Sequence, residues 1–274
     1  MQNFLGKLLG NSISAKEKAL KALEIQEAKF IRKQQNIESP WINQKLEGVV
    51  PEKLQITLNQ AFNKAFELVF SKGKSLIEKT YNKEEQERTY KMNAYASELK
   101  ESKKTIGAFS KQAGKQKAKN LLISGIEGIG LGALGVGLPD IPLFTGVLLK
   151  SIYEIALSYG FSYEEEVEQI FILKLIEGAL LQGEECIEAN QKLNDWIDRG
   201  IEQTVQGKLR ENRKQQIQKT ADILSNALLY MKFIQGIPIV GVIGGVADTI
   251  YLNKITTYAH LKYKRRFLKM NRSK

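Results

Sequence analysis

Residues 120–160 read NLLISGIEGIGLGALGVGLPDIPLFTGVLLKSIYEIALSYG, and this apolar, glycine-rich stretch decides the fold. Each glycine weakens an isolated helix by about 1 kcal/mol relative to alanine, so close packing has to compensate for it. Gly128 and Gly132 lie one helical turn apart, and two such bare positions let another helix approach at backbone distance. We therefore expect this stretch to be buried against other helices.

A proline corner divides the stretch into two arms. Pro139 and Pro142 flank Asp140, and each proline lacks a backbone donor and biases the residue before it away from the helical region. Apolar residues return at helical spacing after Pro142, from Phe144 to Tyr159. The pattern predicts a hairpin of two helices around this corner.

Three interpretations compete for the hairpin. Residues 130–135 match the dinucleotide fingerprint G-x-G-x-x-G, but that motif needs a strand before it and an amphipathic helix after it. A membrane-spanning or re-entrant hairpin needs about 20 uninterrupted apolar residues, and Glu127 interrupts the first arm. The third interpretation, a central hairpin in the core of a soluble helical domain, is the one we favour.

Composition favours an all-α fold, a helical bundle built around the hairpin. The 274 residues are 43% hydrophobic and 26% charged, and alternating apolar runs between Asn-Gly or Asp-Gly turns are absent from the sequence. The only cysteine, Cys186, rules out an intramolecular disulfide and favours a reducing compartment. We divide the chain into an N-terminal helical arm, residues 1–40, and a main all-α domain, residues 41–274.

Basic residues are concentrated in two regions of a chain with a net charge of +11. In the first, which precedes the hairpin, the candidate lipid contacts are Lys111, Lys115, Lys117 and Lys119. In the second, the C-terminal segment, they are Lys264, Arg265 and Arg266. An acidic region, residues 164–198, lies between the two.

Basic clusters beside apolar segments attract anionic lipid by about 1 kcal/mol per residue near a membrane surface. They also attract nucleic acid, but a nucleic-acid surface would interleave aromatic side chains, and residues 100–119 offer only Phe109. Lipid is therefore the better partner. A solvated basic face that raises solubility is the simpler alternative.

The N-terminal segment predicts a short interfacial helix. Its apolar residues share one helical face and are Phe4, Leu5, Leu8 and Leu9. A segment that docks on the protein's own core fits the same pattern. Lys7 interrupts the apolar start, so we expect no cleavable signal.

Three sites carry helix-start signals. Ser14 can cap the helix that follows it, and Asn82 begins a pattern like a capping box with Glu85. The polar helix after Asn82 has few apolar anchors, which indicates a peripheral position. Residues 162–165, SYEE, match the capping box and predict a helix start at Ser162.

The features of the hairpin return in residues 236–248, GIPIVGVIGGVAD. Pro238 makes a corner, and Gly241 and Gly245 repeat the four-residue spacing of small residues. Asp140 and Asp248 are placed to interact with helix N-termini near the two corners. We expect these two glycine-faced elements to pack on each other.

Catalytic and metal-binding patterns are sparse. The single histidine, His260, rules out a two-histidine zinc site, and it lies in a context typical of a packed or surface residue. A Cys186–His260 nucleophile pair is disfavoured because the acidic helix around Cys186 would raise the pKa of its thiol. A pair of carboxylates, Glu127 with Asp140 or Asp248, remains a hypothesis for a hydrolase. We expect no metal and no cofactor.

The same motifs resemble the EcsC family. The resemblance is carried by residues 135–142 (GVGLPDIP), 148–155 (LLKSIYEI) and 232–246 (KFIQGIPIVGVIGGV), and by 45–51 (KLEGVVP) nearer the N-terminus. It covers most of the chain. It implies a helical, intracellular bacterial protein of a family named from an operon with an ABC transporter. It supplies no agreed activity, cofactor or catalytic residue.

We therefore expect a non-enzymatic, cytoplasmic protein that associates with the inner membrane surface, through anionic lipid or through a membrane protein such as a transporter. Two alternatives stay open. One is a soluble module that binds a lipid, another hydrophobic ligand or a protein between glycine-lined helices. The other is a hydrolase that uses buried carboxylates.

Overall fold

A computed structural model describes residues 13–36, 52–73, 77–122, 140–201, 213–234 and 246–270, and every regular element within these ranges is helical. The all-α prediction is thus confirmed. The elements are α2 (Ala15–Gln35), α4 (Glu52–Leu68), the π-turn η1 (Val69–Gly73), α6 (Lys83–Leu99), α7 (Lys103–Leu122), α8 (Asp140–Ser158), α9 (Glu166–Leu180), α10 (Gly183–Arg199), α12 (Arg213–Ile234) and α13 (Val246–Lys269).

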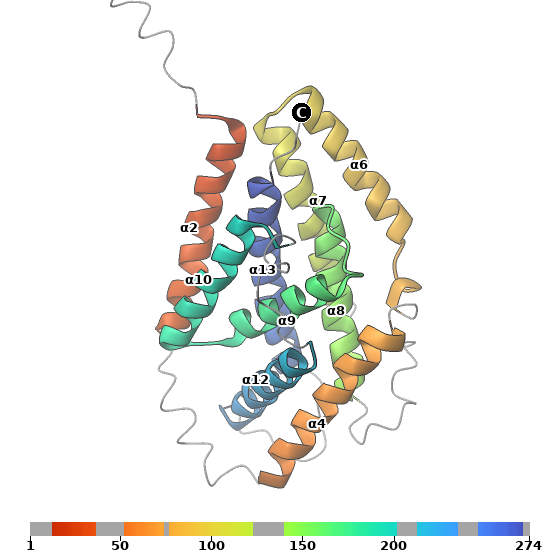
Figure 1. Cartoon of the computed structure of the whole chain (residues 1–274), viewed down its shortest axis with the longest axis vertical. Helices are drawn as coiled ribbons and strands as arrows, with labels where there is room; N and C mark the ends of the chain where they lie inside the picture. Colours follow the sequence, from red (N-terminus) through yellow and green to blue (C-terminus); the bar gives the residue numbers. More distant parts are fainter. Residues whose placement is uncertain are drawn as a thin grey trace, which may run out of the picture.

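Helix α8 lies at the centre of the molecule and packs against α4, α6, α7 and α13 (Figure 1). From Ile141 to Tyr159, every residue except Leu143 is buried. Within the described ranges, residues 141–158 form the one helix long and apolar enough to cross a membrane, and 94% of that window is covered by the rest of the protein. Its place in the core accounts for this composition, because a helix surrounded by other helices is apolar on all sides.

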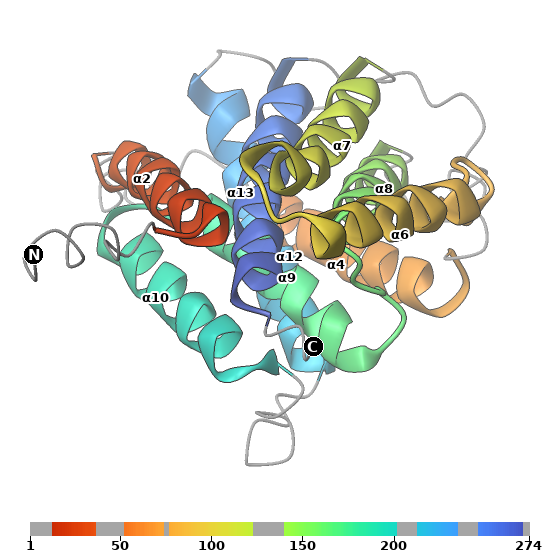
Figure 2. The ribbon, with the colours of Figure 1, turned by 90° about the horizontal axis from the view of Figure 1, so that it is seen from above.

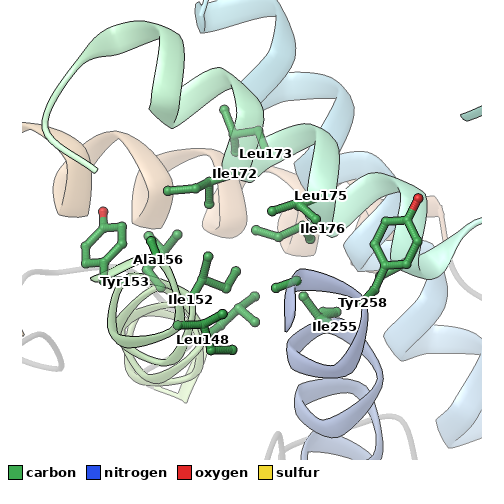
Figure 3. Packing of buried hydrophobic residues seen from close by; sticks show 14 of the residues in the cluster. Leu148, Ile152, Tyr153, Ala156, Ile172, Leu173, Leu175, Ile176, Ile255 and Tyr258 are labelled. Carbon is green, nitrogen blue, oxygen red and sulfur yellow. The ribbon is translucent and has the colours of Figure 1, made fainter. Parts of the chain in front are cut away.

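Helices α8, α9 and α13 meet in an apolar core (Figure 3). Leu148 and Ile152 come from α8, Ile172 and Ile176 from α9, and Ile255 from α13, and each is fully buried. These side chains pack the distant α13 against the consecutive helices α8 and α9 and so hold the second half of the chain together. This core fixes where α13 presents its charged residues.

The remaining helices pack around this core. Helices α2 and α10 lie side by side next to α13, while α6 and α7 pack against α8 on the other side (Figure 2). Helix α12 packs between α4 and α9. The described helix of the predicted N-terminal arm, α2, therefore packs on the helices of the main domain. The predicted boundary at residue 40 itself lies outside the described residues.

Two of the three helix starts predicted from capping residues are found in the structure. Ser14 and Glu17 form a reciprocal capping box on α2, and Asn82 accepts a hydrogen bond from the Glu85 amide at 2.8 Å. The predicted start at Ser162 is wrong. Helix α9 begins at Glu166, and the Ser162 hydroxyl accepts from the Glu164 amide at 3.3 Å instead, which caps a local turn before the helix.

The second arm of the hairpin begins earlier than predicted. Helix α8 starts at Asp140 rather than after Pro142. Pro142 is tolerated there because the amides of the first helical turn have no partner inside the helix. Helix α7 continues to Leu122, the beginning of the predicted first arm.

The glycines and the remaining prolines of the two predicted glycine-faced elements lie outside the described residues. They are Gly128, Gly132, Pro139, Pro238, Gly241 and Gly245. Their nesting stays a prediction. Asp140 and Asp248 each lie in the first turn of a helix, but their side chains are not among those described.

Candidate functional site

Helix α13 carries the C-terminal basic residues, and the fold pairs the first of them with an acid of α2. The Lys262 ammonium lies 3.1 Å from the Glu27 carboxylate and donates to Asn190 at 2.5 Å and Asn194 at 2.6 Å on α10. The Lys262 side chain is fully buried, and burial lowers its pKa to about 8, although the Glu27 carboxylate opposes that shift. This buried cluster joins α2, α10 and α13.

A second buried pair joins α13 to α9. The Arg266 guanidinium lies 2.5 Å from the Glu168 carboxylate and stacks over the Phe161 ring at 4.1 Å. The Tyr263 hydroxyl donates to the other oxygen of Glu168 at 2.6 Å. Because the charge is paired, hydrogen-bonded and covered by aromatic rings, this arginine serves packing between helices.

Arg265 makes the third pair. It donates two hydrogen bonds to the Asp198 carboxylate of α10, at 3.0 and 2.7 Å, and Lys269 lies 3.3 Å from the same carboxylate. The sequence predicts Arg265 and Arg266 as lipid contacts, yet each side chain is only 10% exposed and engaged by an acid. We therefore leave these two residues out of any membrane-facing surface.

Helix α7 presents a different set of basic residues. Lys103, Lys104, Lys111 and Lys115 are exposed, and none of them forms an ion pair with a residue that the structure describes. Gly107 and Gly114 share this outward face, and a Cβ atom at either would meet no atom within 4 Å. Lys119 belongs to α7, but its side chain is outside the described part.

Helix α6, which leads into α7, exposes an apolar stripe that sequence reasoning missed. Met92, Tyr95 and Leu99 are 67%, 65% and 70% exposed, while Gln86 is the only buried residue of α6. Their spacing of three and four residues puts them on one helical face. That spacing, in a helix with few other apolar residues, was the signal available in the sequence.

A third group of basic residues gathers between α7 and α13. The Lys117 ammonium donates to the Thr257 hydroxyl at 2.5 Å, which brings the C-terminal half of α7 against α13. His260 follows Thr257 by three residues and Lys264 follows His260 by four, and both are half-buried, as Lys117 is. Lys117 and Lys264, both predicted as lipid contacts, thus lie with His260 in one cluster.

The two lysines of this cluster act electrostatically on the imidazole of His260. Burial lowers the pKa of His260 to about 4, and the positive charges of Lys264 and Lys117 contribute to that shift. Burial also lowers the pKa of both lysines. The Tyr159 hydroxyl lies 3.4 Å from the imidazole nitrogens and donates to Ser110 of α7 at 3.3 Å. The sequence presents His260 as a packed or surface residue and gives no sign of this cationic environment.

The described buried carboxylates are bound to neighbouring helices. Glu27 and Glu168 pair with α13, Glu177 pairs with Lys219 of α12, and Glu154 accepts from Gln86 of α6 at 3.0 Å. These contacts give the acids a role in holding helices together. The carboxylate pair predicted for a hydrolase involves side chains outside the described part, so it stays a hypothesis.

The nucleophile pair gains no support. The Cys186 thiol is buried, donates to the Gly183 carbonyl at 3.1 Å, and has a raised pKa, chiefly because burial disfavours the thiolate. The sequence predicts this direction of shift from nearby acids, whereas the structure assigns it to burial. No cluster of metal-ligating side chains occurs among the residues with described positions. The predicted interfacial residues Phe4, Leu5, Leu8 and Leu9 lie outside them.

Comparison with known proteins places this architecture in a family. The family model described as the EcsC protein family matches residues 17–268. Protein EcsC of Bacillus subtilis strain 168 is 26% identical over 156 residues, 54% of this chain and 56% of that protein. The uncharacterized protein YdbA of the same strain is 27% identical over 159 residues, 56% of this chain and 54% of that protein.

The matched region spans about half the length of these two curated relatives. No solved structure is significantly similar to the chain. Because the family model covers all the described helices except the outermost residues at each end, the chain belongs to the EcsC protein family.

Proposed function

We propose that this protein is a non-enzymatic peripheral protein that binds anionic lipid at the inner face of the cytoplasmic membrane, through the surface formed by α6 and α7. This α6–α7 surface consists of Met92, Tyr95, Leu99, Lys103, Lys104, Lys111 and Lys115. The observation that carries the proposal is that these exposed lysines lack an acidic partner within the described residues and follow directly after an exposed apolar stripe.

The two parts of the surface supply complementary interactions. Each lysine near an anionic surface contributes about 1 kcal/mol, so four give a salt-dependent attraction of about 4 kcal/mol. Met92 and Leu99 can insert their side chains at the level of the lipid headgroups, and Tyr95 suits the boundary between apolar and polar layers. Stable membrane attachment commonly needs two such signals rather than one.

The short connection between α6 and α7 places the exposed apolar stripe next to the exposed lysines. Leu99 ends α6, and Lys103 and Lys104 begin α7 only four and five residues later. Glu101, which lies between them, accepts a hydrogen bond from the Lys16 amide of α2 at 3.1 Å, so its charge is directed towards the start of that helix. The corner between α6 and α7 therefore combines an apolar tip with a positive flank.

Sedimentation of the full chain with vesicles tests the proposal. We expect binding to vesicles that contain phosphatidylglycerol, weaker binding to pure phosphatidylcholine, and loss of most binding in high salt. Replacing Lys103, Lys104, Lys111 and Lys115 by glutamine should weaken binding by at least about tenfold. The matched control replaces Lys18, Lys21, Lys29 and Lys33 of α2, which are also exposed, and should weaken it far less.

A second set of variants separates the apolar contribution to vesicle binding from the electrostatic one. Replacing Met92, Tyr95 and Leu99 by serine should remove the binding that survives high salt while leaving the salt-sensitive part. Equal loss in the α7 and α2 lysine variants would show that only net charge matters and would contradict the proposed surface. A folded protein that ignores anionic vesicles at low salt would refute lipid binding, and recovery on native membranes alone would point to a membrane protein instead.

A further inference from the structure

Three half-buried basic side chains, Lys117, His260 and Lys264, lie where α7 packs against α13. Thr257, His260 and Lys264 occupy one face of α13, and Lys117 reaches them from α7 through its 2.5 Å hydrogen bond to Thr257. Thr257 in turn donates to the Asn253 carbonyl at 2.6 Å, so its hydroxyl is fixed and holds the ammonium of Lys117 in place. The position of the Lys117 ammonium is thus set by hydrogen bonds within the protein.

The cluster differs from Lys262, Arg265 and Arg266, the basic residues of α13 whose side chains are buried. Lys262, Arg265 and Arg266 each have a carboxylate within 3.1 Å. Within the described ranges, neither Lys117 nor Lys264 has an acidic partner at ion-pair distance. Both ammonium groups therefore lie close enough to His260 to contribute to the lowering of its pKa.

We propose that Lys117, His260 and Lys264 form a binding site for a phosphate-type oxyanion. The two ammonium groups supply the charge, and the imidazole donates a hydrogen bond to an oxygen of the anion. Ser110 lies at the same place through its contact with Tyr159 and has a hydroxyl proton to donate. An anion here would provide the negative charge that the described part of the protein does not place near these groups.

The oxyanion can be the phosphate of a lipid headgroup or a free phosphate, because both present the same oxygens to the site. Phosphate binding at this cluster is independent of the α6–α7 surface. That surface consists of exposed residues of α6 and of the outward face of α7, whereas the cluster lies on the face of α7 that meets α13. Either proposal can fail while the other holds.

The single histidine provides a direct probe. Nuclear magnetic resonance of the full-length protein should show one histidine ring whose pKa lies well below the usual 6.5 in buffer without phosphate. Added inorganic phosphate should shift this resonance in a saturable way, with a dissociation constant of about 1 mM, and raise the pKa of His260 by about one unit. Chloride at equal ionic strength should leave both unchanged.

Two variants separate binding from general electrostatics. Lys117→Gln with Lys264→Gln should raise the pKa of His260 without phosphate, because two repelling charges are gone, and should weaken phosphate binding by about tenfold or more. Lys111→Gln with Lys115→Gln removes the same charge from the exposed face of α7 and should leave the phosphate titration unchanged. Equal weakening in both variants, or no saturable shift in the wild type, would overturn the site.

Two probes distinguish a soluble phosphate from the phosphate of a lipid headgroup. Glycerol 3-phosphate should bind as inorganic phosphate does if the site takes soluble anions. If it takes a lipid headgroup, phosphatidylglycerol vesicles should shift the His260 resonance in the variant that lacks the α7 surface lysines, at lower phosphate concentrations than the soluble anions need. A shift with vesicles that the Lys117→Gln, Lys264→Gln variant retains would contradict the site.

Discussion

Helices α7 and α13 carry the two basic regions of this chain, and the structure uses them in different ways. On α13, Lys262, Arg265 and Arg266 turn inward to acids of α2, α10 and α9. On α7, Lys111 and Lys115 point outward, and no described acid pairs with them. A run of basic residues therefore does not by itself define a surface, because acids on neighbouring helices determine which of its charges stay unpaired.

Helix α13 itself contains both kinds of basic residue, those paired with an acid and those without a described acidic partner. Lys264 is half-buried beside Lys117 and His260, while its neighbour Arg265 is bound by Asp198 through two hydrogen bonds. Consecutive residues of a helix point about 100° apart, so one faces α7 and the other faces α10. Substitutions on each side of this division should therefore have different effects, and the largest are expected where a buried acid pairs with the basic residue.

Removing Arg266 should have the largest effect on stability. Arg266→Met leaves the buried Glu168 carboxylate without its guanidinium, and breaking such a pair from one side costs about 3–5 kcal/mol. Urea denaturation of the variant should therefore show a large fall in the free energy of unfolding. Lys111→Met, which makes the same kind of replacement on the exposed face of α7, should change it by less than about 0.5 kcal/mol.

The double variant Arg266→Met, Glu168→Gln identifies the cause. It removes both charges, while the amide that replaces the Glu168 carboxylate keeps an oxygen for the Tyr263 hydroxyl, so much of the lost stability should return. If the double variant were as unstable as the single one, packing of the guanidinium on Phe161 would matter more than the pairing.

The sequence predicts the helical class, the central apolar stretch and two helix starts, because hydrophobic spacing and capping residues act locally. It does not predict that Glu27, Glu168 and Asp198 meet the basic residues of α13, since those contacts join residues far apart in the chain and depend on how the helices pack. The same reason explains why Lys117 and His260 could not be recognised as neighbours.

The start of α9 shows a different limit. Residues 162–165 match the capping box, yet the helix begins at Glu166, because Tyr163 is drawn into contacts of its own. Its hydroxyl donates to Glu78 at 2.6 Å and its ring stacks on Tyr153 with centroids 4.0 Å apart. A local motif is overridden where tertiary contacts hold the side chain elsewhere.

Lowering the pH should reduce the free energy of unfolding through His260, because its pKa is lowered in the folded protein. The folded protein holds the pKa of His260 near 4, whereas the unfolded chain binds a proton at the usual value of 6.5. Between these values the unfolded state binds more protons, so the free energy of unfolding should fall as the pH is lowered from about 7 towards 4. Denaturation at several pH values measures this slope.

The variant His260→Gln isolates that contribution, because acids with lowered pKa values, such as Glu27 and Asp198, also reduce stability at low pH. The variant should lose stability less steeply than the wild type between pH 7 and 4. Phosphate should likewise reduce the wild-type slope, since a bound anion favours the protonated imidazole. Identical slopes in variant and wild type would show that His260 does not titrate as the structure implies.

The smallest changes in the free energy of unfolding are expected at two adjacent residues, Arg265 and Lys264, and they should have opposite signs. Arg265→Gln should lower the free energy of unfolding by about 1–2 kcal/mol, because it removes two charge-assisted hydrogen bonds to Asp198. Lys264→Gln should raise it by about 0.5 kcal/mol in phosphate-free buffer, because it removes a half-buried ammonium whose pKa burial lowers. Residues kept for binding are commonly unfavourable for stability, whereas residues kept for packing are not. A loss of stability in both variants would mean that Lys264, like Arg265, serves the fold, and the oxyanion site would then lose its physical basis.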